Sequence, residues 1–517
     1  MNTRLAVFQM ESVLGNIAQN AQKILDACEK SADAEILITP ELALTGNVGD
    51  DFFNADFFNQ VQCVLNQMAQ EVHQNLPHLS LIVGTPILKN NALLNAAVLL
   101  QNGKIAKIHA KKPEHWEKRY FSGTEHADFY APIFVKDLII SFSPPPLKAS
   151  VVLKAQALNY AQNLKIAPNQ IFLNRLGLDL PFIFEGQSTA LDENAQCIWR
   201  APAFEENLAL LSLQNGKFFY EGDDPMLLEE NTEQRIWQAL VFALKRYFER
   251  NGFQYAVLGL SGGIDSGVVL ALAVQALGKD KVKALILPSP FTSPESLEDA
   301  HQLAQNLNIT PIEIPILPLM NAYEKALAKT FKKIPEPAMD TTFENLQARI
   351  RGQLIMAYAN RTNALVLNTS NKSECAVGYS TLYGDLIGGI SPIKDVLKTQ
   401  IFALARYCNQ KKEIIPLRMI EKAPSAELKP NQKDEDSLPP YPLLDAFLKS
   451  YIEESQPFSA IVQNGINKKT AGEILNKIKK AEFKRRQAPS GFLVSLRGFD
   501  YNFNFPIENA YGHNEQN

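Results

Sequence analysis

The segment Leu258-Gly-Leu-Ser-Gly-Gly-Ile-Asp-Ser-Gly267 decides the fold of the C-terminal half of this chain. An apolar, strand-like run (255–260) leads into it, and an apolar, helix-like run (268–277) follows it. A strand, a Gly-rich turn and a helix start together hold an anion. Glycine lets the backbone approach closely, and the N–H groups at a helix start attract negative charge. The pattern therefore predicts a phosphate site at this turn.

The polar residues of the turn refine this prediction. Gly262 and Gly263 free the backbone, and Ser261 and Ser266 add hydroxyl donors. Asp265 is unexpected beside a phosphate, because two anions repel each other. A Mg²⁺ ion between carboxylate and phosphate resolves the conflict. The alternative, an ordinary Ser/Gly turn between strand and helix, is disfavoured by the six-residue pattern in this context.

The turn lacks the Gly-Lys-Ser/Thr of a Walker loop. Ser-Gly-Gly-x-Asp-Ser instead resembles the pyrophosphate loop of the N-type ATP pyrophosphatases. The resemblance implies that ATP is split into AMP and pyrophosphate while a carboxyl or carbonyl group is activated as its adenylate.

Composition sets the frame for this site. With 517 residues, 46% of them hydrophobic and 21% charged, the chain is expected to form two soluble globular domains. The net charge of −4 gives no reason to expect a nucleic-acid partner. The first residues lack a signal-peptide profile, and no apolar run reaches membrane-spanning length. Five cysteines without a CxxC pair fit a reducing cytoplasm.

A domain boundary is predicted at residues 219–231. A hairpin-like pattern ends there, and the acidic stretch Glu229-Glu-Asn-Thr-Glu233 begins a helix. We therefore expect an N-terminal domain (1–218), a linker (219–231) and a C-terminal domain (232–517).

Strand-like and helix-like runs alternate in the C-terminal half, with further strands at 284–288 and 364–369. This alternation predicts a doubly wound, Rossmann-like parallel sheet with helices on both faces. Further motifs follow in a fixed order, and they occupy residues 344–352, 370–385, 393–398, 424–428, 434–441 and 482–489.

In that order, these motifs resemble the synthetase domain of NAD synthetase over residues 226–512. Asn-Lys-Ser-Glu (371–374), Gly-Tyr-Ser-Thr-Leu-Tyr-Gly-Asp (378–385) and Lys-Arg-Arg-Gln-Ala-Pro (484–489) carry the resemblance. It implies ATP-dependent amidation of deamido-NAD, in which ATP adenylates the nicotinate carboxylate and ammonia displaces AMP. A GMP synthetase is a weaker alternative, which the last two motifs disfavour.

The resemblance assigns roles to individual residues. Asp265 and Glu374 would hold Mg²⁺, and Lys398 would reach the ATP phosphates. Ser425 would donate to a phosphate, and Thr369, at a strand end, matches an ATP-contacting position. ATP is thus expected as co-substrate and Mg²⁺ as cofactor, with Asp265 and Lys398 as the catalytic residues.

The second substrate is assigned in the same way. Asn345, Glu374 and Lys484 match positions that contact deamido-NAD, and Asp385 would help to bind ammonia or the nicotinate ring. Arg349 or Arg351 would face the dinucleotide phosphates. Taken singly, lysines such as Lys398 and Lys484 are usually solvated, and only the ordered co-occurrence of the motifs favours a site.

Residues 1–218 differ in pattern, because strands and hairpins dominate them. Asn102-Gly103 and Asn215-Gly216 are hairpin signals between apolar runs. Strands are expected at 5–9, 35–39, 79–83 and 96–100, and helices at 16–31, 54–75 and 147–164. These elements predict an α/β sandwich.

The segment Ile38-Thr-Pro-Glu-Leu-Ala-Leu-Thr-Gly46 resembles the glutamate motif of the nitrilase superfamily. Segments 117–121, 184–188 and 202–206 continue the resemblance. It implies an α/β/β/α sandwich. In bacterial glutamine-dependent NAD synthetases such a domain hydrolyses glutamine and passes ammonia to the synthetase.

That hydrolysis needs a cysteine nucleophile, a glutamate and a lysine. Glu41 matches the glutamate and Lys111 the lysine, with Lys112 as an adjacent alternative. The family places the cysteine at a strand end in the interval occupied here by residues 130–146. This interval holds no cysteine and looks too short for the expected strand and the helix after it. We therefore expect Glu41 and Lys111 to persist only as a buried ion pair.

Replacement nucleophiles are disfavoured. Cys197, Cys28 and Cys63 have the pattern of small buried hydrophobes, and Ser141 or Ser143 would need an activating base. Free ammonia is therefore the expected nitrogen donor. Two alternatives remain open: glutamine use through an unrecognised nucleophile or a separate glutaminase, and a non-catalytic scaffold with a relic ATP site. A homodimer or higher homo-oligomer is expected from the family.

Overall fold

The computed structural model describes residues 2–90, 92–114, 117–122, 127–143, 148–163, 166–222, 231–335, 337 and 340–508. The chain divides into two compact units, Met1–Glu229 (the N-terminal unit) and Glu230–Asn517 (the C-terminal unit), a division that falls inside the predicted linker. The last strand of the N-terminal unit, β15 (Lys217–Tyr220), enters that linker, and residues 223–230 lie outside the described residues. In the described ranges, no helix is both long and apolar enough to cross a membrane.

The N-terminal unit contains two large β-sheets. The first has the order β15-β14-β1-β2-β3-β4-β5, and the second has the order β13-β12-β9-β8-β7-β6. The first comprises β1 (Asn2–Gln9), β2 (Ile36–Ile38), β3 (Ser80–Lys89), β4 (Ala92–Gln101), β5 (Lys104–Ala110), β14 (Asn207–Gln214) and β15. The second comprises β6 (Ile133–Val135), β7 (Leu138–Ser141), β8 (Ser150–Lys154), β9 (Gln170–Asn174), β12 (Thr189–Leu191) and β13 (Cys197–Arg200). A hairpin of β10 (Leu176–Asp179) and β11 (Phe182–Glu185) stands apart.

The alternation of side chains along these strands produces two cores. Leu5, Val7 and Ile38 face Val151 and Leu153 of the second sheet in a core between the sheets. The intervening residues of β1 and β2 face α1 (Ile17–Lys30) and α2 (Ala55–Asn75) in another core. Asparagine side chains cap both helices at their N-termini. The predicted strands, these two helices and a sandwich of two sheets are therefore confirmed. Between β6 and β15 the described residues contain no α-helix.

Both predicted hairpins are also confirmed. Asn102 and Gly103 join β4 to β5 with φ of 53° and 74°, and Asn215 and Gly216 join β14 to β15 with φ of 50° and 77°. These left-handed values are those of a type I′ turn, which matches the twist of the paired strands.

The predicted helix at 147–164 is wrong. Residues 150–154 form β8, which pairs in parallel with β7 and β9, and a short 3-10 helix, η4 (Leu158–Asn163), follows. Four residues of β8 are buried, so its apolar run lacks the alternation that identifies a half-exposed strand. Residues 130–146, the interval that looked too short for the cysteine-bearing strand, contain β6 and β7, and the next strand, β8, follows them.

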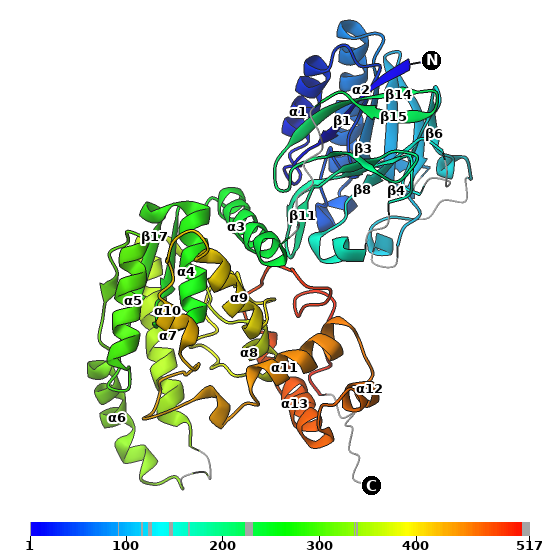
Figure 1. Ribbon diagram of the computed structural model, residues 1–517. Helices are drawn as coiled ribbons and strands as arrows, with labels where there is room; N and C mark the ends of the chain where they lie inside the picture. Colours follow the sequence, from blue (N-terminus) through cyan, green and yellow to red (C-terminus); the bar gives the residue numbers. More distant parts are fainter. Residues whose placement is uncertain are drawn as a thin grey trace. The chain divides into compact units, whose positions relative to one another are not determined.

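The C-terminal unit is built on a parallel sheet of order β18-β17-β16-β19. Its strands are β16 (Tyr255–Gly259), β17 (Val282–Ile286), β18 (Ile312–Glu313) and β19 (Ala364–Val366). Helices cover both faces (Figure 1): α6 (Leu317–Phe331) and α7 (Thr342–Thr362) bury one face of the sheet. The predicted doubly wound fold is confirmed.

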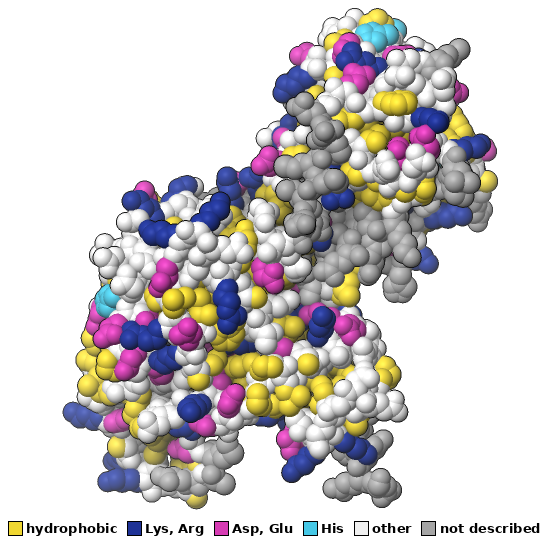
Figure 2. All heavy atoms as spheres, in the orientation of Figure 1, with side chains coloured by type: hydrophobic (Ala, Val, Ile, Leu, Met, Phe, Trp, Pro, Cys, Tyr) yellow, Lys and Arg dark blue, Asp and Glu magenta, His cyan; other side chains and the backbone are white. Residues whose placement is uncertain are grey.

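The remaining helices of this unit surround the sheet or form a smaller helical cluster with its own core. They are α3 (Thr232–Asn251), α4 (Ile264–Leu277), α5 (Pro294–Asn306), α8 (Lys372–Val377), α9 (Lys398–Cys408), α10 (Leu417–Glu421), α11 (Tyr441–Leu448), the π-helical η7 (Lys449–Glu453), α12 (Phe458–Gln463), α13 (Lys468–Lys480) and α14 (Glu482–Arg485). On the face of this unit shown in Figure 2, acidic and basic side chains are interspersed.

Candidate active site

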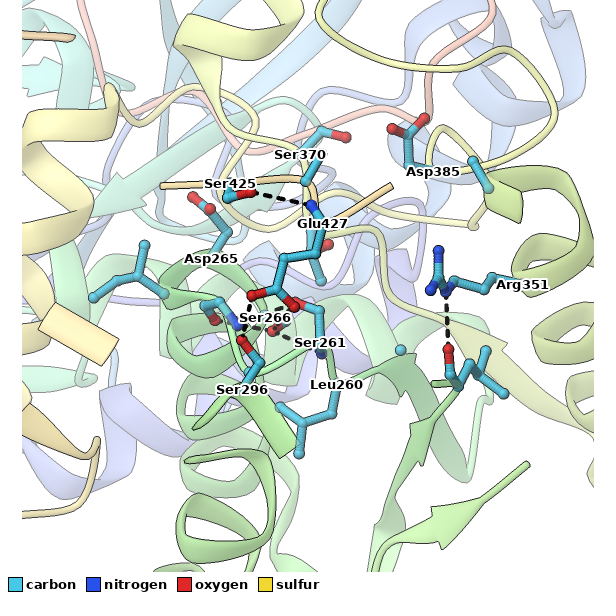
Figure 3. Close-up of a pocket in the computed structure, with 18 of the residues that line it drawn as sticks. Leu260, Ser261, Asp265, Ser266, Ser296, Arg351, Ser370, Asp385, Ser425 and Glu427 are labelled. Carbon is cyan, nitrogen blue, oxygen red and sulfur yellow. Dashed lines mark hydrogen bonds between the residues drawn. The ribbon is translucent and has the colours of Figure 1, made fainter. Parts of the chain in front are cut away.

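The predicted phosphate turn connects β16 to the N-terminus of α4. Gly262 has φ of +81°, and a Cβ atom there would lie 2.1 Å from the carbonyl oxygen of Ser296. Both facts require glycine. The Ser261 and Ser266 hydroxyls lie 3.1 Å apart, and Ser261 Oγ accepts from the N–H of Gly263 at 3.2 Å (Figure 3). The Ser261 and Ser266 hydroxyls and the N-terminus of α4 thus lie together in this turn.

This turn forms one wall of a cavity of about 310 Å³. Every ATP-contacting residue predicted from the sequence lines it, as do Glu374 and Asp385. Figure 3 labels Ser261, Asp265, Ser266, Ser425 and Asp385 among them. Thr369 lies just beyond the end of β19, and Ser425 lies in the loop after α10. Asn345 and Lys484 do not line the cavity. The carboxyl end of the parallel sheet therefore carries the site, as expected for this topology.

A buried charge cluster lies at the cavity wall. Lys398 Nζ lies 2.5 Å from a carboxylate oxygen of Asp265 and 3.3 Å from one of Glu374, and the lysine side chain is only 3% exposed. Asn371, the N-cap of α8, donates from Nδ2 to the other Asp265 oxygen at 2.9 Å. Burial opposes the charge of Lys398, but Asp265 and Glu374 raise its pKa above the ordinary lysine value. Lys398 is therefore a cation at neutral pH.

The carboxylates of this cluster outnumber its cation. Asp434 also lines the cavity, and it accepts from the hydroxyls of Tyr379 and Tyr441 at 3.1 and 2.9 Å. Burial, together with the charges of Asp265 and Asp434, raises the pKa of Glu374 to about 8 despite Lys398. At neutral pH Glu374 is therefore mostly protonated, and a hard divalent cation would displace this proton and complete its shell with phosphate oxygens and water. Within the described ranges, no three His, Cys, Asp or Glu side chains form a metal site by themselves.

Asn345 and Lys484 reach the cavity only indirectly. Asn345 Oδ1 accepts from Thr381 Oγ1 at 2.7 Å, and the N–H of Thr381 donates to Asp385 at 2.5 Å. Lys484 Nζ donates to the carbonyls of Gly378 and Ser380 at 2.8 and 2.6 Å. Both residues therefore hold the segment that carries Asp385. Loss of surrounding solvent raises the pKa of Asp385 to about 6, so it is mostly ionised at neutral pH.

Sequence patterns missed some residues of the cavity. Lys422 Nζ lies 2.7 Å from Glu427, whose carboxylate also accepts from Ser293 and Ser296. Lys422 lies two residues before the 424–428 motif and Glu427 lies within it, so this motif was the sequence signal that could have identified them. Of the two arginines left open, Arg351 lines the cavity. Asn371 belongs to the 371–374 motif, but its hydrogen bond to Asp265 is a tertiary contact that a local sequence pattern does not predict.

The N-terminal unit brings Glu41 and Lys111 together. Lys111 Nζ lies 2.9 Å from Glu41 and 3.0 Å from Glu117, and both carboxylates are almost fully buried. Asn95 Nδ2 donates to Glu41 at 2.7 Å, and so does the N–H of Ala155 at 3.2 Å. Burial and the charge of Glu41 raise the pKa of Glu117. The predicted ion pair is therefore present, and a second glutamate joins it.

The strand whose end faces Glu41 is β8, which continues as Lys154-Ala155-Gln156. None of the five cysteines lies there: Cys28 is buried in α1, Cys63 is exposed on α2, Cys197 belongs to β13, and Cys375 and Cys408 belong to the C-terminal unit. Lys112, the alternative lysine, lies over the ring of Tyr130 instead.

One serine does have a potential base. Ser141 Oγ lies 3.0 Å from Nε2 of His109, and both residues are almost completely buried, with 2% and 4% exposure. Burial lowers the pKa of His109 to about 4, so its ring is neutral at physiological pH. Ser143 donates its backbone N–H to Ser141 Oγ. The pair has the partners of a core hydrogen-bond network.

Comparison with known proteins gives a consistent picture. A family model described as NAD synthase matches residues 236–488, and one described as carbon-nitrogen hydrolase matches residues 4–144. The glutamine-dependent NAD(+) synthetase of Synechocystis sp. is 36% identical over 98% of this chain and 99% of its own length, and that of Acinetobacter baylyi is 34% identical over 98% of each. A solved glutamine-dependent NAD+ synthetase from Acinetobacter baumannii, in complex with ADP, is 30% identical with a TM-score of 0.73 and 98% of each chain covered.

The alignment with the Synechocystis relative spans 556 positions, more than the 517 residues of this chain. The alignment therefore contains positions at which this chain has no residue. The hydrolase match also ends at residue 144, before β8 begins.

Proposed function

Because this chain belongs to the glutamine-dependent NAD(+) synthetase family, we propose that it converts deamido-NAD to NAD with consumption of ATP. The chemistry is assigned to residues 232–517. The observation that carries the proposal is the cluster of Lys398, Asp265 and Glu374 in the same cavity as the phosphate turn. This is the arrangement that adenylation of a carboxylate requires.

The first step joins two anions, so the site must neutralise both. The N–H groups at the start of α4, with the Ser261 and Ser266 hydroxyls, bind the ATP phosphates. Lys398 stabilises charge that develops as a nicotinate carboxylate oxygen attacks the α-phosphorus and pyrophosphate leaves. Asp265 and Glu374 would hold Mg²⁺, which when bound neutralises phosphate charge.

The second step is attack of ammonia on the adenylated carbonyl. The nitrogen forms a C–N bond, AMP leaves with the bridging oxygen, and a proton leaves the nitrogen. Asp385 is assigned to this proton, because it lines the cavity and its pKa of about 6 leaves it ionised at neutral pH. Asn345 and Lys484 keep its segment in place.

Free ammonia is the proposed nitrogen donor, and the N-terminal unit supports this choice. A thiol hydrolase needs a nucleophile at the strand end facing Glu41. Here the strand end offers Lys154 and Ala155 and no thiol. Without a nucleophile, Lys111, Glu41 and Glu117 act as a buried structural ion-pair cluster.

Glutamine use is the second candidate, since the relatives named above are glutamine-dependent and the Ser141–His109 pair could supply a nucleophile. Its burial and the lack of a thiol favour ammonia. We also propose a homodimer or higher homo-oligomer, as expected from the family resemblance. Sedimentation equilibrium tests this assembly, and a monomer at micromolar concentration contradicts it.

The proposed reaction is tested by following AMP and NAD in purified protein with ATP, Mg²⁺, deamido-NAD and ammonium chloride. One NAD should form for each AMP. Lys398→Met should lose about 100- to 1000-fold in kcat, the range for loss of a principal charge-stabilising group. A protein that forms no AMP with deamido-NAD contradicts the proposal and supports the scaffold alternative.

A further inference from the structure

The helix that carries Lys398 caps only part of its own N-terminus. Lys398 is the first residue of α9, and the residue before it, Leu397, has no side chain that can accept a hydrogen bond. The first N–H groups of a helix lack backbone partners within the helix and need partners from elsewhere. Gln400 of α9 accepts the N–H of Leu397 at 3.0 Å, but the next two N–H groups find their partners in two other helices.

The external partners are Ser373 of α8 and Asp445 of α11. The N–H of Lys398 donates to Ser373 Oγ at 2.9 Å, and the N–H of Thr399 donates to one Asp445 oxygen at 2.7 Å. Ser373 Oγ in turn donates to the other Asp445 oxygen at 2.5 Å. Ser373 is 0% exposed and Asp445 4%. One buried carboxylate thus fixes the start of α9, directly and through Ser373.

Helix α11, which carries Asp445, also contacts the ammonium end of the Lys398 side chain. Tyr441 lies four residues before Asp445 on α11, and its ring centroid is 5.2 Å from Lys398 Nζ. Residues four apart share one face of a helix. This face of α11 therefore contacts the backbone of Lys398 through Asp445 and its ammonium group through Tyr441. A side chain held at both ends loses little freedom when it acts.

We propose that Asp445 is a positioning residue for the adenylation step: by capping α9 from outside, it sets the place of the Lys398 ammonium group between Asp265 and Glu374. The inference rests on the proposed function in that Lys398 handles the ATP phosphates. Asp445 itself does not line the cavity. Its bond to Ser373 also anchors α8, which carries Glu374, so the proposed route through Lys398 has to be separated from a route through α8.

A double-mutant cycle tests this dependence. Asp445→Asn keeps the shape but removes one accepting oxygen, and kcat should fall roughly 100-fold, the scale for a misplacement of about 1 Å. In the protein that already carries Lys398→Met, Asp445→Asn should cause no further loss. Ser373→Ala removes the hydroxyl that joins the N–H of Lys398 to Asp445, and it should give the same two results. It replaces Asp445→Asn if that variant fails to fold.

The matched control is Asp395→Asn. Asp395 is also a buried carboxylate, 5% exposed, and it accepts from the N–H groups of Val494 and Ser495 at 2.9 and 2.8 Å. Its other partners are Lys372 Nζ and Ser495 Oγ, each at 3.0 Å, and not Lys398. Its effect should multiply with that of Lys398→Met. If Asp445→Asn multiplies in the same way, the positioning role is overturned.

Hydrogen–deuterium exchange provides a readout that does not need activity. In Asp445→Asn or Ser373→Ala, the amides of residues 398–399 should exchange at least about tenfold faster than in the wild type, while those of 494–495 stay unchanged. Asp395→Asn should do the reverse. Unchanged exchange at 398–399 overturns the external cap, whereas an inactive wild type with the expected exchange contradicts only the proposed function.

Discussion

Replacing Gly262 by alanine tests the phosphate turn most sharply, since this position combines two separate demands for glycine. Its φ of +81° costs an ordinary residue about 1–2 kcal/mol. The new Cβ would also lie 2.1 Å from a backbone oxygen, that of Ser296, which cannot rotate away. Relieving such a clash costs about 1–3 kcal/mol more. The turn must therefore shift by an amount that spoils the binding of phosphate.

We expect Gly262→Ala to raise KM for ATP at least about 30-fold, because about 2 kcal/mol of distortion must be reversed on binding. Two glycines provide controls. Gly252 has φ of +73° with no atom within 4 Å of a new Cβ, so Gly252→Ala isolates the backbone cost. Gly472 lies in α13 with neither demand, so Gly472→Ala should be neutral or stabilising by about 0.5–1 kcal/mol.

Steady-state kinetics and urea unfolding of the three variants decide the matter. Gly252→Ala should lower the free energy of unfolding by about 1 kcal/mol and leave KM for ATP unchanged. If Gly262→Ala also leaves KM unchanged, the turn does not approach the phosphates, and the reasoning fails.

Three further outcomes are expected. Mg²⁺ affinity, measured by calorimetry with a non-hydrolysable ATP analogue, should weaken as the pH falls below about 8. The reason is that Glu374 then takes up a proton, which competes with the metal. An affinity that stays constant from pH 9 to 7 argues against Glu374 as a ligand. Lys111→Met should destabilise the N-terminal unit by about 3 kcal/mol in urea unfolding, because it leaves Glu41 and Glu117 buried without their cation. Ammonium-supported NAD formation should persist in this variant. Ser141→Ala should leave ammonium-supported NAD formation unchanged. Glutamine-supported NAD formation that the wild type shows and Ser141→Ala loses would identify Ser141 as the nucleophile.

The C-terminal site could be predicted because its residues are encoded in short motifs at strand ends. Topology brings the ends of parallel strands to one edge, so the phosphate turn, Thr369 and the 371–374 motif had to meet there. Lys422 and Glu427 pair within one loop after α10, and they were missed because their contacts with Ser293 and Ser296 form only in the folded protein. The two-residue strand β18 is too short to leave a pattern.

The predicted helix at 147–164, where the structure has β8, shows that hydrophobic periodicity alone does not distinguish a buried strand from a helix. Ser150-Val-Val-Leu153 is buried on both faces of a sheet, and such a run has the same composition as the buried face of a helix. β-branched residues were the available hint. The conclusion about the nucleophile did not depend on this error, because the true strand end also lacks a cysteine.

The nitrogen donor is the central claim, and one comparison tests it directly: the rate of NAD formation with ammonium chloride against the rate with glutamine, using the purified full-length chain, ATP, Mg²⁺ and deamido-NAD. Ammonium should support turnover, and glutamine free of ammonia should support none above background. Comparable rates with glutamine would contradict the account and place a working nucleophile in the N-terminal unit.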